Sequence, residues 1–139
     1  MPIRWRQGVN HTIRTLHLQR AVCELFRCEP VFASLQHAGV VSTAFIGACD
    51  YVMSRDAPVQ SDSGWVFFET GYDGSKGEYC SLYELSLKKP DILPFLALPV
   101  SSRVIVRPGW REVIFNGVKK TSGNSELLKQ LAESPAPSV

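Results

Sequence analysis

The N-terminal part of the chain carries apolar residues with helical spacing. Over residues 11–28, six large apolar side chains recur, mostly at intervals of three or four positions: Ile13, Leu16, Leu18, Val22, Leu25 and Phe26. This recurrence is typical of an amphipathic helix. Asn10 or Thr12 can cap the start of the helix, and Pro30 limits its end. We therefore predict a helix over residues 11–28 and a further helical turn over residues 31–35.

After Gly39 the pattern changes to short apolar runs bounded by Gly, Pro, Asp and Ser, as expected of strands separated by turns. Strands are predicted at residues 40–46, 51–55, 64–69, 103–107 and 111–116. Residues 80–87 fit either a strand or a helical turn. A short helix is expected at 91–96, and a last helix, capped by Ser125, at 126–132. The order predicts an α+β fold: an antiparallel or mixed sheet of about five to six short strands, with an N-terminal helix and a short C-terminal helix.

The chain has 139 residues, which is the usual size of a single domain. Within it we expect an N-terminal helical extension at residues 1–37 and an α+β core at 38–118. Residues 119–139 then form a C-terminal helix and a flexible tail, because the last six residues combine two prolines with small side chains.

Charge is distributed unevenly although the net charge is only +2. Residues 50–86 hold seven acidic side chains against two basic ones, a local net charge of −5, whereas residues 87–139 carry a local net charge of +4. The overall charge therefore says nothing about nucleic acid, and the acidic middle favours a cationic partner; no nucleic-acid partner is expected. Arginine interleaved with tryptophan at residues 4–6 and 103–111 also suits nucleic acid, but a charged hairpin explains the second set better.

The four cysteines, at positions 23, 28, 49 and 80, match no zinc-binding spacing, so no metal or other cofactor is predicted. No apolar stretch reaches the roughly 20 residues that a membrane span needs. The N-terminus has no apolar signal-peptide region, and its four arginines fit a basic helix better than a transit peptide. Free thiols and a cytoplasmic location are expected.

Catalytic patterns are weak in this sequence. Cys80 or Ser63 is a conceivable nucleophile, but all three histidines precede residue 38 and no nucleophile-elbow motif is present. A carboxylate pair such as Glu69 with Asp73 or Glu78 has the residue types of a glycosidase, yet carboxylates in a glycine-rich loop are more often solvated. No glycine-rich nucleotide-binding motif occurs. We therefore predict that the protein is not an enzyme.

The segment from residue 55 to 74 is the most informative part of the chain. It places the aromatic run Trp65–Phe68 between a polar loop and a turn rich in Gly and Asp. Trp65 fits two interpretations: a core side chain of the sheet, or a contact for a partner beside Tyr72. Trp65 and Phe67 share one face of the predicted strand, and Val66 and Phe68 share the other. Since both faces are apolar, the strand is predicted to be central and covered on both sides.

An ordered set of segments in the middle of the chain resembles the immunity-protein family numbered thirty-three, formerly a domain of unknown function, of bacterial polymorphic toxin systems. The segments are Val40–Thr43, Tyr51–Asp56, Asp62–Phe68, Tyr83, Pro90–Pro94 and Leu98–Val100. The resemblance covers roughly residues 38–105. Asp56 stands where that family usually has Glu, and the turn after Phe68 departs from its pattern.

This resemblance implies a non-enzymatic protein that binds and neutralises a cognate bacterial toxin, encoded by an adjacent gene, by occluding its active or functional surface. The predicted toxin contacts lie in the acidic segment: Asp56, Asp62, Trp65, Glu69, Tyr72, Asp73 and Glu78. A homodimer through the N-terminal helix is left open. The alternative functions are a small-molecule-binding regulatory domain with a pocket beside Trp65 and, less favoured, a hydrolase.

Overall fold

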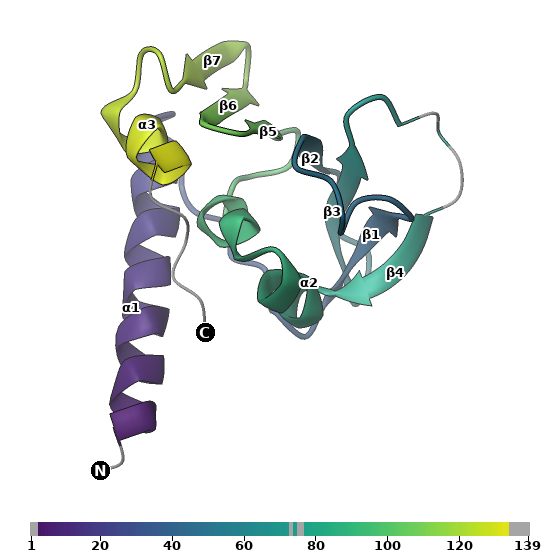
Figure 1. Cartoon of the computed structure of the whole chain (residues 1–139), viewed down its shortest axis with the longest axis horizontal. Coiled ribbons are helices and arrows are strands. Elements are labelled where there is room, and N and C mark those ends of the chain that lie inside the picture. Colours follow the sequence, from purple (N-terminus) through teal and green to yellow (C-terminus); the bar gives the residue numbers. More distant parts are fainter. Residues whose placement is uncertain (1–2, 73, 75–76, 134–139) are drawn as a thin grey trace.

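The computed structural model describes residues 3–72, 74 and 77–133, and its elements confirm the α+β class (Figure 1). Helix α1 spans Ile3–Glu24, α2 spans Leu82–Lys88 and α3 spans Glu126–Glu133. A 3₁₀ helix, η1, spans Pro90–Phe95. The strands are β1 (Ala38–Ser42), β2 (Tyr51–Arg55), β3 (Asp62–Glu69), β4 (Gly77–Ser81), β5 (Arg103–Arg107), β6 (Trp110–Phe115) and β7 (Val118–Thr121). Residues 134–139, where a flexible tail is predicted, lie outside the described part.

All seven strands belong to one mixed sheet, with the order β4-β1-β3-β2-β5-β6-β7. Strands β1 and β3 are parallel, with Val40 opposite Val66, and every other neighbouring pair is antiparallel. The sheet is therefore mixed, as predicted, and has slightly more strands than the five to six expected. Strand β3 lies inside the sheet, paired with β1 on one side and β2 on the other.

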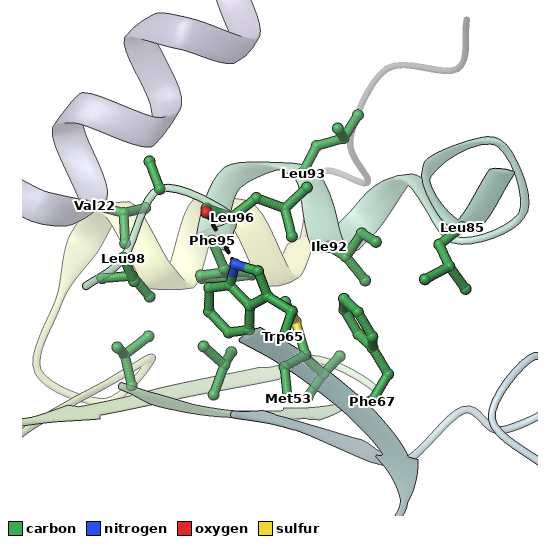
Figure 2. Packing of buried hydrophobic residues seen from close by; sticks show 14 of the residues in the cluster. Val22, Met53, Trp65, Phe67, Leu85, Ile92, Leu93, Phe95, Leu96 and Leu98 are labelled. Atoms are coloured by element: carbon green, nitrogen blue, oxygen red, sulfur yellow. Dashed lines mark hydrogen bonds between the residues drawn. The ribbon is translucent and has the colours of Figure 1, made fainter. Parts of the chain in front are cut away.

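The helical segments lie on one face of the sheet, and the core forms between them (Figure 2). Met53, Trp65 and Phe67 point from the strands into this layer, where they meet Ile92, Phe95 and Leu96 of the η1 region (Figure 2). Val22 of α1 and Leu128 of α3 belong to the same buried cluster. The prediction that both faces of β3 are covered is wrong: Trp65 and Phe67 are buried, but Val66 and Phe68 are only half-buried. The helices cover one face, and the second face keeps partial contact with solvent.

Some elements differ locally from the expected ones. Helix α1 starts at Ile3, eight residues before the predicted start, so Asn10 and Thr12 lie within the helix and do not cap it, and it ends at Glu24, before the predicted residue 28. Residues 31–35 are not helical; the Val31 N–H instead donates to the Ala97 carbonyl oxygen at 2.8 Å. Strand β1 ends at Ser42, and Phe45 becomes buried from within a turn, where its ring packs edge-on against Tyr51 at 4.9 Å between centroids. Of the large apolar residues after Ser42, Phe45 thus indicated burial rather than an extended strand, whereas Ile46 is exposed.

Residues 80–87 contain both of the alternatives that the sequence left open. Strand β4 ends at Ser81, and α2 starts at Leu82. The change follows from a helix cap: the Ser81 hydroxyl accepts a hydrogen bond from the Glu84 N–H at 3.1 Å.

Strand β7 is an element that the sequence interpretation missed. It pairs with β6 through a two-residue turn at Asn116 and Gly117, whose φ values are 52° and 78°. Positive φ at both positions is the signature of the type I′ hairpin turn, which Asn-Gly favours. The signal was therefore present in the sequence, but the sheet was expected to end at residue 116.

A substitution of Gly64 is expected to weaken the junction of β2 and β3. Gly64 has φ +86°, and a Cβ there would lie 2.0 Å from the Asp56 carbonyl oxygen, which is rigid backbone. The Gly64 carbonyl oxygen also accepts the Asp56 N–H at 2.7 Å. We expect Gly64→Ala to lower the free energy of unfolding by more than about 2 kcal/mol, measured by urea denaturation.

Gly71→Ala is the matched control, since Gly71 has φ +87° but no atom within 4 Å of its added Cβ. It should show only the strain of a positive φ, about 1–2 kcal/mol. Equal losses for the two variants would show that the contact with Asp56 does not matter.

Candidate functional site

The Asp62–Trp65 segment, which carries much of the family resemblance, organises the start of β3. The Asp62 carboxylate accepts the Gly64 N–H at 2.8 Å. The Ser63 hydroxyl donates to the Ala38 carbonyl oxygen at 2.8 Å and accepts the Trp65 N–H at 3.2 Å. These bonds hold β3 against β1 and fix the bend at Gly64. The segment therefore has a structural role that its own contacts explain.

Trp65 is fully buried, so the structure favours the core interpretation of this residue over the contact interpretation. Its indole Nε1–H donates to the Leu96 carbonyl oxygen at 3.0 Å (Figure 2). The guanidinium of Arg55 lies 5.6 Å from the indole centroid. Because no part of the Trp65 side chain reaches the surface, we leave it out of the proposed contact surface.

The remaining predicted contact residues separate to the two ends of the sheet. Asp56 and Asp62 lie where β2 ends and β3 begins, and the Asp62 carboxylate is already used in the turn. Glu69, Tyr72 and Glu78 lie at the other end, where β3 finishes and β4 begins. Asp73 lies outside the described residues. Asp62 and Glu69 are the first and last of the eight residues of β3, so about 23 Å of chain separates the two groups.

The residues at the end of the sheet where β3 finishes form, together with Asp50, a surface that we call the acidic end. Its members are Asp50, Glu69, Tyr72 and Glu78. Asp50 joins it because its carboxylate accepts the Thr70 hydroxyl at 2.8 Å, which ties the turn before β2 to the turn after β3. The Ser42 hydroxyl donates to the Glu69 carboxylate, and the Tyr72 ring packs 5.5 Å from that of Phe68. Glu78 is exposed on the edge strand β4. Strands β1, β2, β3 and β4 thus bring three carboxylates and a tyrosine to one end of the sheet.

Asp50 is a site residue that the sequence interpretation missed. It was counted within the acidic stretch but assigned only to a turn. Its side chain is about half exposed and makes an ion pair with Arg107 at 3.6 Å. An exposed pair of this kind contributes little to stability, so the carboxylate stays accessible to a competing cation. Only the pairing of β2 with β3 and β5 places Asp50 beside Glu69.

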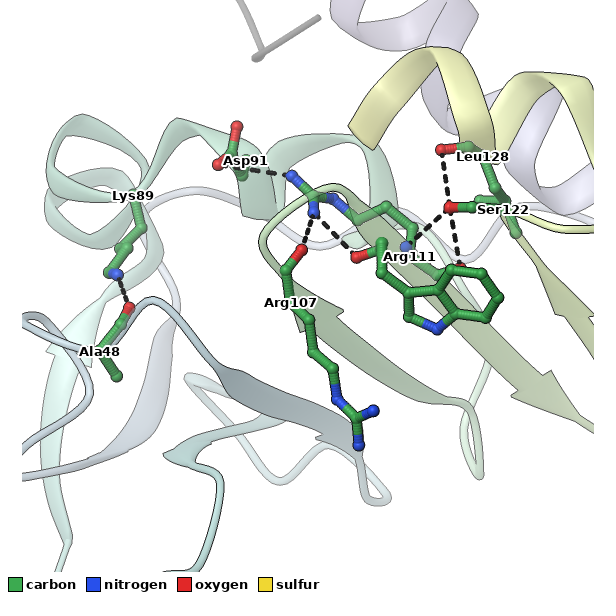
Figure 3. Close-up of polar contacts among 8 residues, drawn as sticks. Ala48, Lys89, Asp91, Arg107, Arg111, Ser122 and Leu128 are labelled. Carbon is green, nitrogen blue, oxygen red and sulfur yellow. Dashed lines mark hydrogen bonds and ion pairs between the residues drawn. The ribbon is translucent and has the colours of Figure 1, made fainter. Parts of the chain in front are cut away.

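A polar network beneath the acidic end fixes the turn that carries Asp50 (Figure 3). The Lys89 ammonium donates to the Ala48 carbonyl oxygen and lies 5.0 Å from the Tyr51 ring centroid. Partial burial lowers the pKa of Lys89 below its ordinary value. These contacts connect the 43–50 segment to the start of η1, so the loop is supported by the helical layer.

Arg111 anchors the neighbouring part of the sheet in the same view (Figure 3). Its buried guanidinium donates to the carbonyl oxygens of Arg107 and Trp110, at 3.0 and 2.9 Å, and pairs with Asp91 at 3.6 Å. The η1 helix is thereby joined to the β5–β6 hairpin. A rigid scaffold of this kind is what a recognition surface made of turns requires.

Catalytic chemistry gains no support from these contacts. Burial, followed by the Glu84 carboxylate, raises the pKa of the Cys80 thiol, which lowers the thiolate fraction that a nucleophile needs. Burial also raises the pKa of Cys23 to about 12. Among the described residues, no group of three or more His, Cys, Asp and Glu could hold a metal ion.

A groove of about 320 Å³ lies on the helical side of the molecule, between α1 and α2. Its lining does not include Trp65, so it is not the pocket that a small-molecule function beside Trp65 would need. Within the described part of the chain, no helix is both long enough and apolar enough to cross a membrane.

Comparison with known proteins identifies the class. The family model described as Imm33-like domain matches residues 18–116, so the chain belongs to the Imm33-like family. The matched range is wider than the 38–105 segment suggested by the motifs, since it also includes the last seven residues of α1 and strand β6. No curated protein and no solved structure matches the chain. Membership in an immunity-protein family points to a non-enzymatic role, with a toxin as the general kind of partner.

Proposed function

We propose that this protein is an immunity protein that binds a cognate bacterial toxin and neutralises it by occluding its active or functional surface. The match of residues 18–116 to the Imm33-like family carries the proposal. The toxin would be encoded by an adjacent gene and would be met in the cytoplasm, which suits a chain with four free cysteines.

The acidic end is the surface that we assign to the toxin. It places Asp50, Glu69 and Glu78 at the same end of the sheet as Tyr72, a residue type that often dominates binding energy. A toxin that acts on nucleic acid needs a basic groove, and an acidic surface complements such a groove and speeds its association. The supporting strands are fixed by the β1–β4 pairing and the Lys89 contacts, so little order is lost on binding.

The direct test is growth of a bacterial strain that expresses the toxin of the neighbouring gene, with and without this protein. Rescue by the protein, together with a stoichiometric complex of the two purified chains, is the expected result. A purified pair that does not associate, or rescue that persists without association, would contradict neutralisation by occlusion.

Reversing two charges at the acidic end is expected to slow toxin binding. Asp50 and Glu78 are both exposed, so Asp50→Lys/Glu78→Lys should fold. We expect association to slow by about tenfold or more at low salt, because electrostatic steering is lost, and to depend less on salt. Stopped-flow or surface-based kinetics at several salt concentrations would measure both effects.

Asp56→Lys/Glu133→Lys is the matched control, because it makes the same change in net charge at exposed positions away from the acidic end. It should leave association within about twofold of the parent rate. An equal slowing in both variants would mean that net charge governs binding. A larger effect in the control would move the contact to the end of the sheet that carries Asp56.

A further inference from the structure

A second surface, separate from the acidic end, is exposed and apolar. Five large side chains that line the groove between α1 and α2 are each between 37 and 54% exposed. They are Leu16, Phe32, Leu35, Tyr83 and Leu87. We call this surface the apolar groove. Exposed apolar side chains that gather around one concave surface mark an interaction site, in contrast to single ones scattered over a protein.

The shape of the apolar groove fits a helix. On α1 the lining residues are Thr12, Thr15, Leu16 and Gln19, which are spaced i, i+3, i+4 and i+7. Such residues form one stripe along about two helical turns, roughly 10 Å. The facing wall is α2, through Tyr83 and Leu87, again one turn apart. A groove with two helical walls of this length accommodates a third helix that presents apolar anchors at i, i+3 or i+4 and i+7.

The groove is supported from below and does not depend on the occupant for its shape. The Gln19 amide donates to the Leu93 carbonyl oxygen at 2.9 Å, which fixes α1 against η1. The Tyr83 N–H donates to the Leu35 carbonyl oxygen at 2.9 Å, which fixes the 32–35 segment against α2. A preformed groove of this kind loses little conformational freedom on binding.

Charge decides which occupant the groove favours. No charged side chain lines it, and Arg20 borders it, since its guanidinium lies 5.7 Å from the ring centroid of the lining residue Phe32. Helix α1 carries four arginines and no acidic residue before Glu24. A second copy of α1 would therefore bring like charges together, which opposes a homodimer through this surface. An occupant with acidic residues beside its apolar stripe would be attracted.

We propose that the apolar groove binds an amphipathic helix of a partner protein, with apolar anchors along one stripe and acidic residues at its border near Arg20. This site is distinct from the acidic end, and the inference does not depend on the toxin-binding function. The protein would then have two contact surfaces of opposite charge preference.

The test is selection of helical peptides from a displayed library, with the full-length protein as bait. The library varies three positions spaced i, i+4 and i+7 and the positions that flank them. We expect enrichment of large apolar residues at the three positions and of Glu or Asp in the flanks. Enriched peptides should bind Leu87→Asp at least about tenfold more weakly, a loss of 1.4 kcal/mol. Ile46→Asp is the control: Ile46 is a similarly exposed apolar residue outside the groove, and binding should not change.

Reversal of one charge tests the acidic border. Arg20→Glu should weaken binding of the acid-flanked peptides and strengthen binding of versions with Lys in the flanks. Arg14→Glu is the control, because Arg14 follows Thr12 by two positions and therefore lies on the opposite face of α1. The measured quantity is the preference between acid-flanked and Lys-flanked peptides. A variant that merely unfolds would lose both kinds of peptide and would not reverse this preference.

Three results would overturn the proposal. One is selection that enriches no pattern, or a pattern unaffected by Leu87→Asp. Another is a dimer in analytical ultracentrifugation that Leu87→Asp dissociates, which would assign the groove to a second copy. The third is binding of dodecanoate, detected as NMR shifts at Phe32 and Leu87, without any peptide binding, which would assign it to a small apolar ligand. Since none of these measurements uses the toxin, they leave the proposed toxin neutralisation untouched.

Discussion

Arg55→Met is expected to lower the free energy of unfolding by about 3–5 kcal/mol, a large fraction of the stability of a domain of this size. The Arg55 side chain is 3% exposed and has only backbone carbonyl groups as its hydrogen-bond acceptors in the described structure. Those acceptors belong to Val31, Ser63, Leu96 and Leu98. Chemical denaturation with a linear extrapolation to water would measure the loss.

The physical reason is the cost of leaving several buried acceptors without donors. Burial alone disfavours the charged guanidinium and lowers the pKa of Arg55 from its ordinary value. The carbonyl oxygens offset this cost because a hydrogen bond to a charged donor contributes about 1.5–3 kcal/mol. Arg55 also joins β2 to two segments that have no strand of their own, around residues 31 and 96–98.

Arg103→Met provides the control, since Arg103 is an exposed arginine on the strand that pairs with β2. Its loss should change stability by less than about 0.5 kcal/mol. Arg55→Lys should fall between the parent and Arg55→Met, because one ammonium cannot reach all the acceptors at once. A fully stable Arg55→Met variant would show that the desolvation cost of the buried guanidinium equals the free energy that its hydrogen bonds contribute.

Trp65→Ala is expected to lower the free energy of unfolding by a similar amount, about 3–5 kcal/mol. The side chain is the largest among the fully buried ones, and its removal leaves a cavity between the sheet and η1. It also removes a donor to the Leu96 carbonyl oxygen, which in the described part of the chain also accepts from Arg55 at 3.3 Å. Thermal and chemical denaturation would both register the loss.

Trp65→Phe separates the two components, because it keeps most of the volume and deletes the indole N–H. It should lose about 1–3 kcal/mol, and toxin affinity per folded molecule should stay unchanged. A folded, stable Trp65→Phe protein with weaker toxin binding would instead restore the interpretation of Trp65 as a contact residue. Because Arg55 and Trp65 share an acceptor, their effects should not add in the double variant.

The sequence predicted those elements that local signals specify. The β2 and β5 bounds agree with the apolar runs at 51–55 and 103–107. The final helix begins after Ser125, whose hydroxyl accepts the Leu128 N–H at 3.3 Å, as a capping residue should. Strand β7 could also have been predicted, because the Asn116-Gly117 pair in the sequence already specifies the turn that leads into it. Turns and caps are chosen by a few neighbouring residues, so they can be inferred without the rest of the chain.

Contacts between distant segments could not be inferred in this way. The predicted contacts were all assigned to the acidic stretch of residues 50–86, without a position in space, and β3 extends through this stretch and separates Asp56 from Glu69. Pairing of β2 with β3 and of β1 with β4 brings Asp50, Glu69 and Glu78 together at one end instead. Charge along the chain therefore predicted the composition of the site, whereas the order of the strands decided its position.

The sequence by itself determined the α+β class, most strands, the Ser125 cap of the last helix and the immunity-protein family, because each depends on local pattern or on ordered motifs. Only the tertiary structure decided that Trp65 and Arg55 are internal and that α1 and α2 enclose an apolar groove. Arg55 is the clearest case: an arginine is normally expected at the surface. Its burial depends on carbonyl oxygens that lie up to 43 residues away in the chain and converge only when the sheet and the helical layer have packed.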